Sequence, residues 1–284
     1  MFIRGKWSKS RYKLIKLIGS GSFGRVYKIE DSKGNIRAIK ISKDILSITN
    51  EYTAMAKLKD MSFVPKVYDM DDWEYKGEIY HFIVMDYIYG KNLKDISTYK
   101  KLDNKIIFRI GQVLTKILKG IDGLGYKYTD IKLENIMVDK AANIYFIDFG
   151  SLVEKNKPTK EYTPSYNINS WNVKFDYTYE MSILFSVTMI MVNLLGMEEY
   201  NPLIYNIEQI IYKIDGFLLK KDWKLFLIDG LKGKYKTFSQ YSTFLDLLLN
   251  DKKYNKSLSK IDYLLIISIV SFVFVIIIGI MSLY

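Results

Sequence analysis

The 284-residue sequence predicts an α+β domain followed by a single transmembrane helix at the C-terminus. Alternating apolar residues on both sides of a glycine-rich loop near residue 20 indicate β-strands, and an amphipathic pattern from Ser47 onward indicates a helix. Residues 263–284 carry no charge and are rich in Ile, Val, Leu and Phe, as a membrane-spanning helix requires. The preceding part of the chain is long enough to form one domain with a sizeable buried core.

The glycine-rich loop comes first along the chain, at residues 19–24, with the sequence Gly-Ser-Gly-Ser-Phe-Gly. Leu14, Leu17 and Ile18 precede it, and residues 25–29 alternate like a second strand. A dinucleotide-binding fingerprint would instead have a helix after the glycines. Between two strands, glycines let backbone N–H groups approach phosphates without a Cβ in the way. The pattern therefore predicts a phosphate-binding loop.

A lysine at the end of the next strand pattern is the candidate cation for the phosphates. The strand ends in Ala-Ile-Lys at Lys40. Ser47 is a good helix N-cap, and Glu51 then lies on the same helix face as Ile48 and Met55. A carboxylate on an apolar face needs a cationic partner, so we expect Glu51 to pair with Lys40. A solvated helix position is the alternative for Glu51.

Four polar residues in the middle of the chain match the needs of phosphoryl transfer. Asp130, Lys132 and Asn135 lie within six residues, and Asp148 follows Asp130 by 18 residues as the first residue of Asp-Phe-Gly. Phosphoryl transfer needs a carboxylate at the attacking hydroxyl, a cation on the γ-phosphate and oxygen ligands for Mg²⁺. The interval before Asp148 leaves room for a short hairpin that returns the chain to the same site. An ordinary turn is the alternative for the first three residues alone.

With these motifs in this order, residues 11–250 resemble the Hanks-type serine/threonine protein kinases. The resemblance implies a bilobal protein-kinase fold, in which a small antiparallel sheet with one helix and a mainly helical lower lobe enclose ATP. It also implies that Asp130 orients the substrate hydroxyl and accepts its proton, and that Lys132 steadies the γ-phosphate. Asn135 and Asp148 would hold Mg²⁺.

The resemblance extends to the adenine-binding side of the site. Residues 82–87 resemble the strand that leads into the kinase hinge, with Met85 as gatekeeper and the backbones of Asp86 and Ile88 at adenine. A plain buried strand is the alternative for this stretch. The ATP-binding residues that the resemblance implies are Gly19, Ser20, Gly21, Ser22, Phe23, Gly24, Val26, Ala38, Lys40, Glu51, Met85, Asp86 and Ile88.

Shorter segments narrow the resemblance. Residues 3–7, 46–49, 160–163 and 189–193 are similar to the YabT-like membrane-anchored kinases of spore-forming bacteria. This similarity implies a bacterial kinase that phosphorylates Ser/Thr hydroxyls of proteins and has a sporulation-linked role.

Several positions depart from the family pattern. Tyr128 and Thr129 stand where His and Arg usually precede the catalytic aspartate, so a phosphate on the activation segment would lack its customary cation. The usual Ala-Pro-Glu is absent near residues 168–170, and the aspartate expected in the next helix is replaced near Ile183. These changes concern regulation and substrate docking more than ATP chemistry. They leave open a small-molecule or lipid phosphotransferase, or a non-catalytic membrane-tethered scaffold, as alternative functions.

The activation segment, between Asp148 and Ser170, contains hydroxyls of the kind that this family often phosphorylates on itself. We expect phosphorylation there not to act as an on-switch of the usual strength, because Thr129 offers no charge. The expected positions are Thr159, Thr163 and Ser165.

The C-terminal segment predicts where the protein resides. As a helix, residues 263–284 would span about 33 Å, against a hydrocarbon core of about 30 Å. Four lysines precede it within the linker, residues 251–262, so the positive-inside rule places the kinase domain on the cytoplasmic side of the cell membrane. A buried core helix is the alternative. Residues 1–10 form an N-terminal extension without the apolar run of a signal peptide.

The net charge of +11 suits anionic lipid or nucleic acid, although a solvated lysine-rich surface explains it equally well. The linker is short, which counts against a nucleic-acid partner bound by that segment. The chain has no cysteine, which excludes disulfides, and its single histidine, His81, starts a predicted strand as a structural residue. No feature of the sequence predicts an oligomeric state.

Overall fold

The computed structural model describes residues 1–250, except 22, 159–161 and 174–175. The chain divides into two compact units, Met1–Leu245 and Asp246–Tyr284, and the first unit holds almost all of the described part. The predicted linker, residues 251–262, and the predicted transmembrane helix, residues 263–284, lie outside the described residues.

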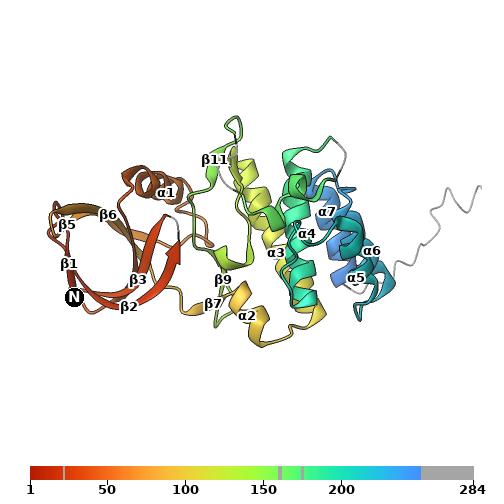
Figure 1. Ribbon diagram of the computed structural model, residues 1–284, viewed down its shortest axis with the longest axis horizontal. Coiled ribbons are helices and arrows are strands. Elements are labelled where there is room, and N and C mark those ends of the chain that lie inside the picture. Colours follow the sequence, from red (N-terminus) through yellow and green to blue (C-terminus); the bar gives the residue numbers. More distant parts are fainter. Residues whose placement is uncertain (22, 159–161, 174–175, 251–284) are drawn as a thin grey trace, which may run out of the picture. The chain divides into compact units, whose positions relative to one another are not determined.

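The first part of the chain forms a six-stranded antiparallel sheet with one helix. Its elements are β1 (Phe2–Arg4), β2 (Arg11–Gly21), β3 (Gly24–Asp31), β4 (Ile36–Ser42), α1 (Ile45–Lys57), β5 (Val67–Tyr75) and β6 (Glu78–Asp86). The strand order is β1-β2-β3-β4-β6-β5. Figure 1 shows the strands curling into a ring, with α1 on its outside. The expected small lobe is therefore present, as a strongly curved sheet.

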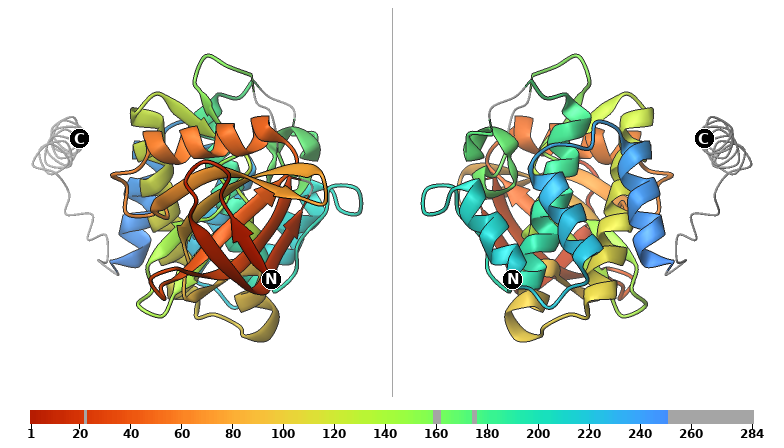
Figure 2. Two further views of the ribbon diagram at one scale, coloured as in Figure 1. Left: turned by 90° about the vertical axis from the view of Figure 1, so that its left-hand side faces the viewer. Right: turned by 90° about the vertical axis from the view of Figure 1, so that its right-hand side faces the viewer.

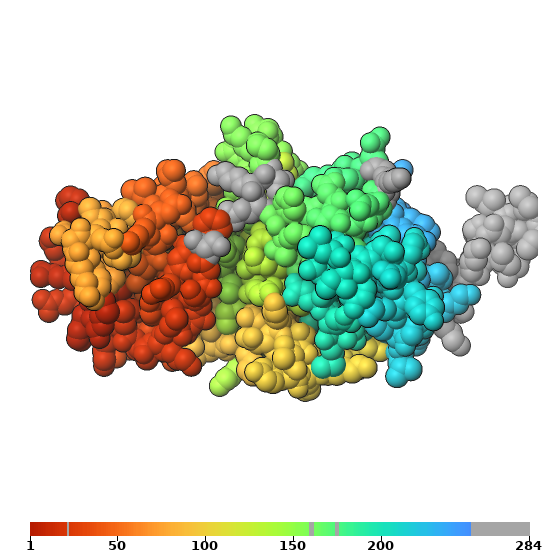
Figure 3. All heavy atoms as spheres, in the orientation of Figure 1, coloured from red at the N-terminus to blue at the C-terminus, as the bar shows by residue number. Residues whose placement is uncertain are grey.

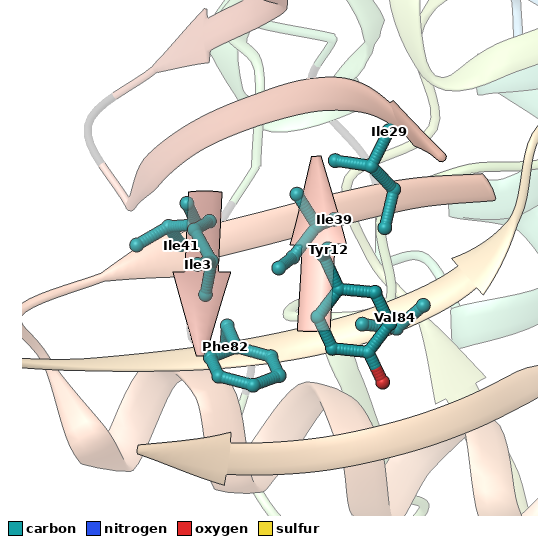
Figure 4. Packing of buried hydrophobic residues seen from close by; sticks show 7 residues of the cluster. All are labelled: Ile3, Tyr12, Ile29, Ile39, Ile41, Phe82 and Val84. Carbon is teal, nitrogen blue, oxygen red and sulfur yellow. The ribbon is translucent and has the colours of Figure 1, made fainter. Parts of the chain in front are cut away.

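The inside of this ring is the core of the small lobe. Side chains from β1, β2, β3, β4 and β6 pack there, as Figure 4 shows. Tyr12 meets Phe82 edge to face, with ring centroids 5.9 Å apart. Ile3 from β1 is fully buried in the same cluster. Residues 1–10, expected as an extension, thus contribute a strand to the sheet and an apolar side chain to its core.

The turn after β1 joins the two edge strands of the sheet. The backbone N–H of Lys6 donates to the carbonyl oxygen of Asp72 in β5, at 2.8 Å. The carboxylate of Asp71 accepts the backbone N–H groups of Trp7 at 3.1 Å and Ser8 at 2.7 Å. These bonds lower the pKa of Asp71 although its burial acts in the opposite direction. The turn therefore bridges β1 and β5 across the gap in the ring.

Helix α1 begins earlier than the sequence predicts. Its N-cap is Asp44, whose carboxylate accepts the backbone N–H groups of Leu46 and Ser47. Ser47, the expected N-cap, is already inside the helix. Asp and Ser are both good N-caps, so composition alone does not choose between them.

The lower lobe is mainly helical. Its helices are α2 (Leu93–Tyr99), α3 (Asn104–Gly123), α4 (Tyr179–Gly196), α5 (Ile207–Asp215), α6 (Lys221–Leu231) and α7 (Phe238–Leu249). Helix α4 packs against α3 and α6, as the views of Figure 2 show. Within the described residues α4 alone has the length and apolarity to cross a membrane, but 78% of its most apolar window is buried inside the protein. It is the core helix of this lobe.

Short strands carry the site residues between these helices. They are β7 (Gly90–Asn92), β8 (Tyr126–Tyr128), β9 (Ile136–Asp139), β10 (Ile144–Phe146) and β11 (Leu152–Glu154). Strands β9 and β10 pair as an antiparallel hairpin, with Ile136 opposite Phe146. This confirms the hairpin expected between Asp130 and Asp148. Strand β11 pairs with β8, with Leu152 opposite Tyr128, so the chain after Asp148 runs beside the chain before Asp130.

Candidate active site

A cavity of about 600 Å³ lies where the small lobe meets the lower lobe. This volume is within the range of small-molecule sites. Figure 3 shows the two lobes meeting, with the small lobe in red and orange. The predicted site residues that line the cavity are Gly19, Ser20, Gly21, Phe23, Gly24, Val26, Ala38, Lys40, Met85, Asp86, Ile88, Asp130, Lys132, Asn135 and Asp148. Of the other two, Ser22 lies outside the described residues and Glu51 contacts the side chain of Lys40.

The glycine-rich loop is the turn between β2 and β3. Gly21 pairs with Gly24 across the turn. Gly24 has a φ of +131°, and a Cβ at this position would clash with the carbonyl of Ile41 in β4. Glycine is therefore required there for both its backbone conformation and its close approach to β4.

Lys40, Glu51 and Asp148 form a charged cluster, of which Lys40 and Asp148 line the cavity. Lys40 from β4 makes an ion pair with Glu51 from α1, and its Nζ lies 3.7 Å from Oδ1 of Asp148. Glu51 is 0% exposed, so the alternative of a solvated helix residue is wrong. The expected pairing of Glu51 with Lys40 is confirmed.

Burial and charge act in opposite directions on this cluster. Burial opposes the charged form of Lys40, but the carboxylates of Glu51 and Asp148 outweigh it and raise the lysine pKa. Burial also raises the pKa of Glu51, and the ammonium of Lys40 opposes that rise. A buried carboxylate that loses its cation is strongly destabilising, so the pair is mutually dependent.

The carboxylate of Asp130 is held on both of its oxygens. Oδ2 accepts hydrogen bonds from Nζ of Lys132 at 2.5 Å and from Nδ2 of Asn135 at 3.2 Å. Oδ1 accepts one from the hydroxyl of Thr163 at 2.7 Å. Asn135 Nδ2 also donates to the backbone carbonyl of Asp130, at 3.1 Å. Since the amide nitrogen is used in this way, Asn135 would bind a cation through its oxygen.

The structure describes two of the three positions at which phosphorylation was expected. Thr163 is bonded to the carboxylate of Asp130, and Ser165 is only 9% exposed. Phosphorylation at these positions stays a prediction. A phosphate on Thr163 would stand against the negative charge of Asp130. Thr159, the third expected position, lies outside the described residues. Sequence reasoning missed the role of Thr163, because nothing local links it to a residue 33 positions earlier.

Tyr128 takes the packing role that the family gives to histidine. It is fully buried, its ring stacks on Phe146 with centroids 4.7 Å apart, and it meets Phe149 edge to face at 6.1 Å. Its hydroxyl donates to the backbone carbonyl of Asp148 at 2.6 Å. Burial raises the pKa of Tyr128 well above its usual value, so this hydroxyl stays neutral.

Uncharged side chains occupy the places where the family pattern has charges. The hydroxyl of Thr129 donates to the carbonyl of Ser151 at 3.1 Å, and the backbone N–H of Asp130 donates to the Ser151 hydroxyl at 3.2 Å. After the missing Ala-Pro-Glu, the indole N–H of Trp171 donates to the carbonyl of Ser165, at 3.1 Å. The hydroxyl of Ser186 donates to the Tyr166 carbonyl at 2.6 Å. At these points the described part of the loop between Asp148 and α4 is held by neutral hydrogen bonds.

Ile183, near which the sequence places the replacement of the family's aspartate, is the fifth residue of α4 and is 3% exposed. We call residues 128–135 the catalytic loop. From α4, the hydroxyl of Tyr179, the first residue of the helix, accepts a hydrogen bond from the backbone N–H of Tyr128 in this loop.

The end of β6, where the hinge is expected, is fixed by the side chain of Asp86. Its carboxylate accepts hydrogen bonds from Arg37 at 3.3 Å, from the Tyr68 hydroxyl at 2.7 Å and from the backbone N–H of Lys66 at 3.0 Å. The guanidinium of Arg37 also lies over the Tyr68 ring, 3.7 Å from its centroid. The sequence gives no signal for this cluster, because only the pairing of β4 with β6 brings Arg37 opposite Asp86.

Among the described residues, no group of three or more His, Asp or Glu side chains could by itself hold a metal ion. Asn135 and Asp148 offer two oxygen ligands beside the cavity. A cation that also binds phosphate oxygens needs few protein ligands, which fits this donor set.

Comparison with known proteins agrees with this geometry. The protein kinase domain family matches residues 12–252, and the chain belongs to this family. Members bind ATP together with a divalent cation. The serine/threonine-protein kinase YabT of Bacillus subtilis (strain 168) is 31% identical over 247 residues, which cover 83% of this chain and 70% of YabT. The resemblance that the sequence indicated is confirmed.

More distant relatives match a smaller part of the chain. A probable serine/threonine-protein kinase of Clostridium perfringens is 32% identical over 57% of this chain and 24% of its own length. The yeast serine/threonine-protein kinase KIC1 is 29% identical over 52% of this chain and 14% of its own length. These relatives share the kinase domain with the chain and extend well beyond it.

Proposed function

We propose that this chain is an ATP-dependent serine/threonine protein kinase, tethered to the cytoplasmic face of the cell membrane. The observation that carries the proposal is the arrangement of Asp130. Its carboxylate is oriented by Lys132, Asn135 and Thr163 at a cavity that also contains the Lys40–Glu51–Asp148 cluster. A binding scaffold without turnover would have no need for this complete set.

Each residue has a role in the proposed reaction. Lys40 contacts the α- and β-phosphates and Glu51 holds Lys40 in place. Asp130 orients the acceptor hydroxyl and takes its proton, while Lys132 neutralises charge on the γ-phosphate. Asn135 and Asp148 would hold Mg²⁺, which supplies charge neutralisation on the phosphates. The rate enhancement then comes mainly from positioning and electrostatics.

The proposed acceptor is a Ser or Thr hydroxyl of a protein. The absence of Ala-Pro-Glu favoured a small-molecule phosphotransferase at the level of the sequence. In the structure, Trp171 and Ser186 hold the same loop by other hydrogen bonds. The names of the relatives, which are serine/threonine-protein kinases, support a protein acceptor.

The membrane tether and the sporulation-linked role rest on the sequence. The uncharged segment 263–284 and the lysine-rich linker before it support a single C-terminal span. The similarity to YabT supports a role in spore-forming bacteria. Fractionation of cells that express the full chain or residues 1–250 tests the tether. Full-length protein in the soluble fraction would refute it.

The kinase proposal is tested with full-length protein in detergent, incubated with Mg-ATP and casein and analysed by mass spectrometry. We expect phosphoserine or phosphothreonine on protein, and its loss in Asp130→Asn. Asp60→Asn is the matched control, because Asp60 is exposed and distant from Asp130 in the sequence. Phosphorylation that persists in Asp130→Asn, or that occurs only on added small-molecule acceptors, would refute the proposal.

A further inference from the structure

The first residue of the core helix α4 touches the catalytic loop. The hydroxyl of Tyr179 accepts a hydrogen bond from the backbone N–H of Tyr128, at 3.1 Å. Tyr128 is fully buried and lies two residues before Asp130. A buried backbone N–H needs a partner, and here the partner comes from a helix 51 residues further along the chain.

The position of the Tyr179 side chain is itself well fixed. The side chain of Thr178 caps α4 by accepting the backbone N–H of Met181, which sets where the helix begins. Nζ of Lys127 lies 5.9 Å from the centroid of the Tyr179 ring and donates to the carbonyl of Lys157 at 2.8 Å. Helix α4 in turn packs against α3 and α6. The hydroxyl is therefore presented from the first turn of a helix that is capped and packed against α3 and α6.

The charge state of Tyr179 does not change with physiological pH. Burial raises its pKa above the usual value for tyrosine, and the hydrogen bond from Tyr128 acts in the opposite direction. The hydroxyl remains neutral, so its contact with the catalytic loop does not depend on an ionisation.

Tyr128 transmits this contact to both ends of the catalytic set. Its backbone continues directly into Thr129 and Asp130, and its own hydroxyl donates to the carbonyl of Asp148 at 2.6 Å. A displacement of Tyr128 would therefore move the proposed base and the proposed metal ligand together. Misplacement of catalytic groups by about 1 Å costs on the order of a hundredfold in rate.

We propose that Tyr179 is a positioning residue of the phosphotransfer site. Its hydroxyl fixes the backbone of Tyr128, and through Tyr128 it sets the relative placement of Asp130 and Asp148. The proposal rests on the proposed kinase function. In the sequence, the aspartate that the family has in this helix is replaced near residue 183. In the structure, a neutral hydroxyl at residue 179 supports the backbone of the catalytic loop.

The variant Tyr179→Phe tests the proposal, because it removes the hydroxyl and leaves the ring beside Lys127. In full-length protein we expect kcat to fall about 5- to 50-fold, with the KM for ATP within about twofold of the wild type. Amide exchange at Tyr128 should become about tenfold faster, because its N–H loses its acceptor. A role confined to stability would not produce this separation of kcat from KM.

Tyr12→Phe is the matched control. It removes a tyrosine hydroxyl that donates to Asp69 at 2.6 Å, within the small lobe. We expect its kcat to stay within about twofold of the wild type, although its melting temperature falls. If both variants lose the same fraction of kcat, or if Tyr179→Phe keeps kcat and Tyr128 exchange unchanged, Tyr179 is not a positioning residue.

Two further arms keep the outcomes distinct. If the wild type shows no phosphotransfer, the proposed kinase function fails, while amide exchange at Tyr128 still decides whether Tyr179 fixes the backbone of Tyr128. If Tyr179→Phe cannot be purified, Lys127→Met removes the ammonium beside the same ring. We then expect kcat to fall about two- to fivefold with faster Tyr128 exchange, and unchanged values would overturn the proposal.

Discussion

The two sides of the cavity are held together by different kinds of contact. On the phosphate-binding side, Lys40, Glu51 and Asp148 form buried or partly buried ion pairs. On the catalytic-loop side, Ser151 and Tyr179 bind the loop through neutral hydroxyls. Charged side chains occur where the proposed ligand, ATP, is itself charged. The contacts of Ser151 and Tyr179, which support only the backbone of the catalytic loop, are neutral hydrogen bonds. A buried ion pair adds little net stability over a neutral contact, so the second side can lose its charges without losing its geometry.

This comparison predicts that the largest losses follow from changes on the charged side. Asp148→Asn should lower kcat by about a thousandfold or more while the fold is retained, because a charged ligand for the metal disappears. Turnover with Mg-ATP and a thermal melt measure the two quantities. A variant with wild-type turnover would show that Asp148 holds no cation.

Lys40→Met should lower kcat/KM for ATP by about a hundredfold, since the cation at the phosphates is lost. Lys43→Met is the matched control, because the Lys43 side chain is 60% exposed and pairs with the exposed Glu78. We expect the control to stay close to the wild type. An inactive Lys43→Met beside an active Lys40→Met would mean that the wrong lysine has been assigned.

In Lys40→Met we also expect the stability to depend on pH in a different way from the wild type. Burial raises the pKa of Glu51 above its ordinary value of 4.5, and Lys40 opposes this rise. A carboxyl group whose pKa is higher in the folded than in the unfolded state makes the folded protein less stable as the pH rises through the folded-state pKa. Without Lys40 this loss of stability grows. Between pH 5 and pH 8, the melting temperature of Lys40→Met should therefore fall by about 5 °C more than that of the wild type. Adding Glu51→Gln should abolish this pH dependence, and its persistence would exclude Glu51 as the cause.

Changes on the neutral side should be milder. Ser151→Ala removes the acceptor of the Asp130 backbone N–H, and we expect kcat to fall about three- to tenfold. Steady-state kinetics check this, with Ser97→Ala as control, because Ser97 is a partly exposed residue of α2 whose hydroxyl donates to the carbonyl of Lys94. A loss comparable to that of Asp148→Asn would erase the proposed difference between the two sides.

The smallest effect is expected for phosphorylation of the activation segment. Thr159→Ala should change kcat by less than about threefold, because Thr129 cannot form the ion pair that makes such a phosphate a switch. Phosphorylated wild type and the variant can be compared on one protein substrate. A hundredfold difference would show that another cation performs this role.

The residues that line the cavity could be predicted from the sequence, whereas the neutral contacts that support the catalytic loop could not. Asp130, Lys132 and Asn135 lie in one short motif, and Lys40 and Asp148 belong to others, so local pattern identified the residues that line the cavity. Their roles in binding and catalysis stay predictions. Tyr179 and Tyr128 are 51 residues apart and have no charge pattern to connect them. The same is true of Arg37 and Asp86, which only strand register brings together.

The fold shows a similar division. The glycine-rich turn and the hairpin before Asp148 were predicted, because turn residues and alternation are local signals. Strand β1 was not, because three residues are too few to show a pattern, and its place depends on Ile3 entering the core. The predicted start of α1 was three residues too late, because Asp44 and Ser47 are both good N-caps and the sequence does not choose between them.

The bridge between β1 and β5 has a consequence for the newly made chain. It joins Trp7 to Asp71, which are 64 residues apart, and β5 pairs in turn with β6, which ends at Asp86. At about 5–20 residues per second, ribosomes need roughly 3–13 s to extend the chain from Trp7 to Asp71. During that interval the turn after the N-terminal strand has no partner in β5, and the core that Ile3 enters lacks the side chains of β6. We expect a nascent chain arrested before β6 to be cleaved by protease within its first ten residues, and one arrested well after β6 to be protected there.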